Sequence, residues 1–146
     1  MKEGTTMNNV TKNLTIAMAL TALAGGIASA QSMRADIPFA FRVGEKLMPA
    51  ASYQLNLTGD RREALVIRSS DRKTSALAVS SGWTMAAKSW TATKEPMLAF
   101  DCGGGRCTLA QLWDGESRDA YTFARRQTRG TEHAALTEIR LVRLAE

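Results

Sequence analysis

Histidine and cysteine are scarce in this sequence. Its 146 residues include one histidine, His133, and two cysteines, Cys102 and Cys107. A tetrahedral zinc site takes about four ligands, most often His and Cys side chains, so we expect no metal. The glycines at 103–105 are not followed by the Lys and Ser or Thr of a phosphate-binding loop, and we expect no cofactor.

Concentrated positive charge is also missing. After residue 30 the chain carries 17 Lys and Arg against 13 Asp and Glu, and its basic clusters are small: Arg61-Arg62, Arg72-Lys73 and Arg125-Arg126-Arg129. Nucleic-acid binding needs a concentrated basic face, usually with aromatic or motif support. We therefore expect no nucleic-acid partner.

The one long apolar run lies near the N-terminus. Lys2 and Lys12 precede the run 14–27, which ends in Ala28-Ser29-Ala30 directly before Gln31. This order of basic residues, apolar stretch and small-x-small cleavage site predicts a helical signal peptide over residues 1–30. A retained anchor is the alternative, but a membrane-spanning helix needs about 20 apolar residues, and Gly25-Gly26 interrupts this shorter run. We expect an exported domain at residues 31–146, periplasmic or extracellular, with no stable membrane insertion after cleavage.

The two cysteines are five positions apart and bracket Gly103-Gly104-Gly105-Arg106. In an oxidising compartment an even pair at this distance predicts a disulfide, and glycines allow the chain to reverse with positive φ. We expect a bridge between Cys102 and Cys107 across a hairpin tip, with free thiols as the alternative. So short a loop contributes about 2 kcal/mol to stability, so the bridge fixes one turn and not the fold.

Beyond residue 30 the apolar residues alternate with a period of two, as half-buried strands do. Two regions fit this period less well. The segment from Trp83 to Trp90 has helical spacing, and we interpret it as a loop with a possible helix. Residues 134–144 fit both periods, and we favour a final strand at about 137–144. We expect an all-β domain, a mostly antiparallel β-sandwich or small barrel of about seven or eight strands. The expected elements are a strand at 37–43, a strand after Pro49 with Tyr53, Leu55 and Leu57 facing inward, hairpins at 64–80 and 97–113, and a strand through Tyr121 and Phe123.

Several short motifs resemble a family of small exported bacterial β-proteins of unknown function. The resemblance covers most of the chain after residue 30, and one departure is Ala51, where such proteins commonly have glycine. It implies an exported β-domain and no transferable catalytic residue. The motifs are Ile37-Pro38-Phe39-Ala40-Phe41 with Val43-Gly44, Pro49-Ala50 with Tyr53, Leu65 to Asp71, Leu98-Ala99-Phe100, and Gln111-Leu112-Trp113.

Candidate binding residues are aromatic or basic. Trp83, Trp90 and Trp113, with Tyr121, are a possible aromatic platform for a sugar or peptide; the alternative is that they pack in the core. A second candidate is the basic cluster, because guanidinium groups bind phosphate or carboxylate groups of an envelope polymer; solvated charges at a sheet edge are the alternative. That cluster consists of Arg125, Arg126 and Arg129.

Candidate catalytic residues are few. Asp114, Glu116 and Asp119 surround one expected turn, and two of them could serve as the acid and base of a hydrolase. The alternative is that turns collect carboxylates for local hydrogen bonds. His133 lies in a polar stretch and fits an exposed histidine better than a catalytic base.

The function favoured by the sequence is a non-catalytic binding or structural module of the periplasm or cell surface. Its expected partner is an envelope polymer or another exported protein. A small barrel that carries an apolar ligand and a hydrolase using the turn carboxylates are the alternatives. The sequence leaves the ligand and the oligomeric state open.

Overall fold

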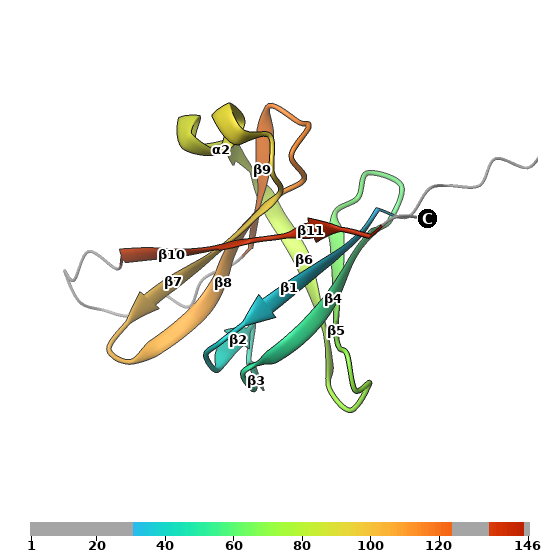
Figure 1. Ribbon diagram of the computed structural model, residues 1–146, viewed down its shortest axis with the longest axis vertical. Coiled ribbons are helices and arrows are strands. Elements are labelled where there is room, and N and C mark those ends of the chain that lie inside the picture. Colours follow the sequence, from blue (N-terminus) through green and yellow to red (C-terminus); the bar gives the residue numbers. More distant parts are fainter. Residues whose placement is uncertain (1–30, 124–134, 145–146) are drawn as a thin grey trace, which may run out of the picture.

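The structure is a computed structural model that describes residues 31–123 and 135–144 (Figure 1). The predicted signal peptide at 1–30, including Ala28 and Ala30, lies outside the described residues, and so do Arg125, Arg126, Arg129 and His133. Gln31 is the first described residue. No helix within the described ranges is long and apolar enough to span a membrane.

The described chain is mostly β-structure, which confirms the all-β prediction. The strand number of seven or eight is wrong, because short pairing segments and interrupted strands raise it to eleven in the described residues. The elements are β1 (Ser32–Ile37), β2 (Phe41–Val43), β3 (Lys46–Met48), β4 (Ala51–Thr58), β5 (Ala64–Ser69), β6 (Ser75–Met85), α2 (Lys88–Thr93), β7 (Met97–Gly103), β8 (Arg106–Trp113), β9 (Asp119–Phe123), β10 (Ala135–Arg140) and β11 (Val142–Arg143).

The predicted strand at 37–43 is two strands. β1 ends at Ile37 and β2 begins at Phe41, where the chain pairs with β3 and, in parallel, with β8. Pro38 lies in the break, and it has no N–H to donate to a ladder. The inward alternation is nevertheless correct, since Ile37, Phe41 and Val43 are buried and Phe39 packs against the same core.

All the described strands belong to one open mixed sheet, in the order β10-β7-β8-β9-β6-β5-β4-β1-β11. Off this order, β2 pairs with β8, and β3 pairs with β2. The two ends of this order, β10 and β11, do not pair with each other, so the small-barrel alternative is wrong. Instead the sheet folds into two halves that face each other across a core (Figure 1). The result is a sandwich-like arrangement, which was the other predicted form.

The chain passes from one half of the sheet to the other within β6 and again between β10 and β11. β6 pairs with β5 through residues 75–79 and with β9 through residues 80–85, with a β-bulge between Ser80 and Gly82. Bulges bend strands in this way at the corners of sandwiches. The C-terminal strand does the same, because β10 pairs with β7 and β11 pairs with β1, with only Leu141 between them. The predicted strand at 137–144 is therefore confirmed as β-structure, in two pieces.

The predicted loop over 83–90 is wrong at its beginning. β6 continues to Met85, so Trp83 is in a strand, and the short helix α2 holds Trp90. The helical spacing of the indoles does not mark one element, because β6 stays paired with β9 through Met85 and the helix begins only at Lys88.

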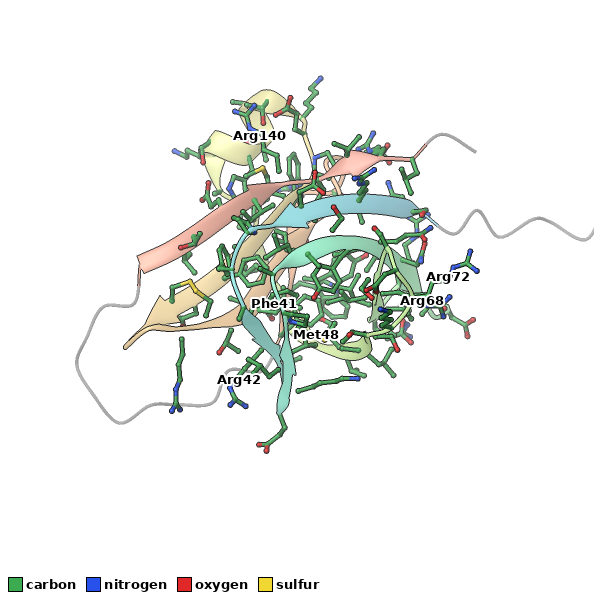
Figure 2. All side chains as sticks on the ribbon, turned by 60° about the horizontal axis from the view of Figure 1, so that its bottom comes forward. Phe41, Arg42, Met48, Arg68, Arg72 and Arg140 are labelled. Carbon is green, nitrogen blue, oxygen red and sulfur yellow. A yellow bond between two sulfur atoms is a disulfide. The ribbon has the colours of Figure 1, made fainter. Side chains whose placement is uncertain are left out.

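The hairpin of β7 and β8 is confirmed with its disulfide. Cys102 and Cys107 are directly opposed, with Cα atoms 4.0 Å apart, and the sulfur atoms are bonded (Figure 2). The reversal is made by Gly104 and Gly105, with φ of +59° and +75°. Positive φ at both central residues is what a two-residue hairpin turn requires, and glycine adopts it without steric strain.

The core lies between the two halves of the sheet. The side chains of Tyr53, Leu55 and Leu57 are buried as predicted, and the Tyr53 hydroxyl donates a hydrogen bond to the backbone carbonyl of Pro49. That bond accounts for the Pro49 to Tyr53 spacing, since it ties the ring to the chain entering β4. Ala51 opens β4 opposite Ile37 and has no positive φ, so the departure from glycine introduces no strain.

Candidate functional site

The three predicted tryptophans do not share one exposed surface. Trp90 and Trp113 are each 2% exposed and pack in a small second core beneath α2, whereas Trp83 on β6 is 57% exposed. The indole N–H of Trp113 donates to the carbonyl of Ser117 at 2.8 Å. Tyr121 is also buried. The geometry of Trp90, Trp113 and Tyr121 therefore matches the core-packing alternative, and Trp83 alone reaches solvent.

Of the predicted turn carboxylates, Asp114 holds the turn together. One oxygen of Asp114 accepts from the backbone N–H groups of Glu116 and Ser117, at 2.9 and 2.8 Å, and the other accepts from the Ser117 hydroxyl at 2.6 Å. Burial acts to raise the pKa of Asp114, but these hydrogen bonds outweigh it and hold the pKa below its ordinary value. A general acid at neutral pH needs a raised pKa, so Asp114 has the properties of a turn-stabilising carboxylate.

The neighbouring charges anchor the C-terminal strand to the same turn. Glu116 pairs with Arg143 at 3.2 Å, and Arg143 also donates to the Asp114 carbonyl at 2.7 Å. Asp119 is exposed at the start of β9. Across residues 31–123 and 135–144 no group of three or more His, Cys, Asp or Glu side chains is placed to hold a metal ion.

The structure brings together a set of arginines that the sequence did not single out as a site. They surround a cleft of about 270 Å³ on the outer face of the half-sheet formed by β1, β4, β5 and β11. We call it the arginine cleft; it is lined by Arg34, Gln54, Arg68, Ser69, Ser70, Arg72 and Leu144.

Strand register explains how these residues meet. Arg34 on β1 is directly opposite Gln54 on β4, and Gln54 is directly opposite Arg68 on β5. Directly opposed residues of antiparallel strands point to the same face, with Cβ atoms about 4.5–5.5 Å apart. The three side chains therefore form one row across the outer face of the sheet.

The turn between β5 and β6 adds polar groups to the cleft beside this row. The Asp71 carboxylate accepts from the Ser69 hydroxyl at 2.5 Å and from the Lys73 backbone N–H at 3.0 Å. The Ser69 hydroxyl also accepts from the N–H of Thr74 at 3.0 Å. These bonds, with the Ser69 hydroxyl first, lower the pKa of Asp71. The turn is thus internally bonded, and it holds Arg72, with φ of +62°, beside Arg68 (Figure 2).

The arginines of the cleft differ in their partners. Arg34 lies 3.5 Å from the Asp36 carboxylate, whose pKa is lowered by the Ser52 hydroxyl and by Arg34. Within the described part of the chain, the guanidinium groups of Arg68 and Arg72 have no hydrogen bond or ion pair. Guanidinium groups bind phosphate and carboxylate oxygens in bidentate fashion. The cleft can therefore hold an anionic group.

Comparison with known proteins adds no assignment. No family model matches the chain, and no curated protein or solved structure is significantly similar to it. The chemistry of the site therefore rests on its geometry. In the sequence the available signal was the outward position of Arg34, Gln54 and Arg68 in three alternating strands.

Proposed function

We propose that this protein is an exported, non-catalytic binding module whose arginine cleft holds phosphate or carboxylate groups of a cell-envelope component. The observation that carries the proposal is the pair of guanidinium groups, Arg68 and Arg72, that line one cleft without a partner in the described chain. Charge-assisted hydrogen bonds to such groups contribute about 1.5–3 kcal/mol each. An anionic ligand supplies partners that residues 31–123 and 135–144 do not.

Export is supported by two independent features. Residues 1–30 have the order of charge, apolar stretch and small residues of a signal peptide. Cys102 and Cys107 form a disulfide, which persists in oxidising compartments and is rare in the cytosol.

The binding proposal is tested by removing the two unpartnered charges. We expect Arg68→Gln combined with Arg72→Gln to weaken the binding of pyrophosphate or citrate at least about tenfold, measured by titration calorimetry at low ionic strength. The matched control is Arg42→Gln with Arg140→Gln, which removes the same charge from side chains away from the cleft (Figure 2). Arg42 donates to the Glu45 carbonyl and Arg140 pairs with Glu95. Equal weakening in the control, or no binding by the unmodified protein, would refute an anion site at the cleft.

Export has its own measurement. We expect the protein expressed with its own N-terminus in a bacterial host to be recovered from the envelope or medium with a mass that begins at Gln31 and lacks the two thiol hydrogens of Cys102 and Cys107. A mass that still begins at Met1 or Met7, on protein held in the cell membrane, would show a retained anchor instead.

A further inference from the structure

Exposed aliphatic side chains flank the arginine cleft on both sides. On β6, Leu77 and Val79 are 62% and 61% exposed, while the small residues Ala76 and Ala78 face the core. Strands usually place their large apolar residues inward, so this reversal is informative. On the other side of the cleft, Val142 of β11 is 64% exposed, and Leu144 lines the cleft itself.

The register places these side chains on the same face as the arginines. Arg68 is opposite Ser75, and the next residue pair on that face is Val66 with Leu77. Leu77 is therefore a diagonal neighbour of Arg68, at about 7–8 Å. Arg34 is opposite Val142. One broad sheet face thus has a basic centre between two aliphatic margins, and we call it the outer face.

The bulge in β6 separates the exposed apolar side chains of the outer face, Leu77 and Val79, from those later in the same strand. The pairing of β6 with β9 gains one residue between Ser80 and Gly82, so the side chains after the bulge change sides relative to Leu77 and Val79. Trp83 pairs with Tyr121, whose ring faces the core. Trp83 and Met85 therefore lie on the inner side of the sheet and not on the outer face that carries Leu77 and Val79.

The charges of the outer face decide what can cover it. Arg34, Arg68 and Arg72 outnumber the two carboxylates of this region, Asp36 and Asp71. Lys46, whose ammonium group donates to the Ser75 carbonyl, adds a further cation. A second copy of the chain would present the same positive excess, and like charges across an interface are unfavourable. A free phosphate ion would occupy the cleft and leave Leu77 and Val79 in water.

We propose that the outer face docks on the surface of an anionic phospholipid bilayer, a step that rests on the proposed anion binding by the arginine cleft. The guanidinium groups contact lipid phosphates, and the aliphatic side chains at both margins enter the interface between headgroups and acyl chains. Basic residues close to an anionic leaflet and apolar side chains at its interface are the two contributions that hold peripheral proteins on membranes. Docking of this kind needs no segment that spans the bilayer.

Vesicle flotation tests this inference with the exported protein. We expect flotation with vesicles of phosphatidylglycerol and phosphatidylethanolamine and none with phosphatidylcholine vesicles. Leu77→Ser with Val79→Ser should weaken vesicle binding at least about tenfold and leave pyrophosphate affinity unchanged. Arg68→Gln with Arg72→Gln should weaken vesicle binding about 25-fold, about fivefold for each charge, and weaken pyrophosphate binding too.

The control removes two exposed apolar side chains from other faces, through Met85→Ser with Leu136→Ser, and should float like the unmodified protein. Because all four residues are exposed, circular dichroism and melting temperature should be unchanged. Binding of pyrophosphate or soluble polyphosphate without vesicle binding would overturn the membrane inference and leave the anion site standing. Failure to bind any of these probes would overturn both.

Discussion

Replacement of Phe41 by alanine is expected to lower the free energy of unfolding by about 3–5 kcal/mol, the usual range for a buried phenylalanine. The Phe41 ring is buried and makes edge-to-face contacts with Tyr53 and Phe100, with ring centres 5.3 and 5.1 Å away. It therefore joins β2 to strands from both halves of the sheet. The total free energy of unfolding of a small domain is about 5–15 kcal/mol, so this single change removes much of the stability.

Urea denaturation followed by tryptophan fluorescence measures the effect. Phe41→Leu retains most of the buried volume and should lose far less stability than Phe41→Ala. Leu47→Ala, at an exposed position on the adjacent β3, should stay within about 0.5 kcal/mol of the unmodified protein. A loss below about 1 kcal/mol for Phe41→Ala would contradict the central position of this ring in the core.

Replacement of Asp114 by alanine is expected to destabilise the protein by about 3 kcal/mol at neutral pH, because the partly buried N–H groups of Glu116 and Ser117 lose a charged acceptor. Asp114→Asn keeps one oxygen acceptor and should lose less. The effect should depend on pH. The pKa of Asp114 is lower in the folded state than its ordinary value of about 3.9. Its charge therefore stabilises the fold above that value, and the contribution is lost as pH falls through the folded pKa.

Unfolding curves between neutral and acidic pH separate this contribution from the others. The unmodified protein should lose stability more steeply on acidification than Asp114→Ala, which no longer has the group that takes up the proton. Parallel pH profiles for the two proteins would show that Asp114 is not the group responsible. The same measurement bears on function, because it distinguishes a turn-stabilising carboxylate from an acid catalyst with a raised pKa.

The local parts of this fold are readable from the sequence. Period-two alternation correctly assigned the inward side chains of β4, including Tyr53 and Leu55. The glycines between Cys102 and Cys107 correctly predicted a hairpin reversal and its disulfide. Each of these features depends on residues close together in the chain, where spacing and backbone freedom decide the outcome.

The features that depend on distant pairing were missed. The bulge that turns β6 from one half of the sheet to the other is set by its partners, β5 and β9, and has no marker in its own alternation. The arginine cleft was missed for the same reason. Arg34 and Arg68 lie far apart in the sequence and form one row only because both are in register with Gln54.

The pairing of β1 with β11 has a consequence for the time at which the molecule can fold. Met33 is opposite Arg143, so nearly the full length of the described chain separates two residues that are neighbours in the sheet. Contacts between such distant residues form slowly, because a very long loop must close first. A nascent chain that lacks β11 leaves β1 with one neighbour, and its assembly is completed only after synthesis has passed residue 143. Such late completion is compatible with translocation of an unfolded polypeptide before the native state forms.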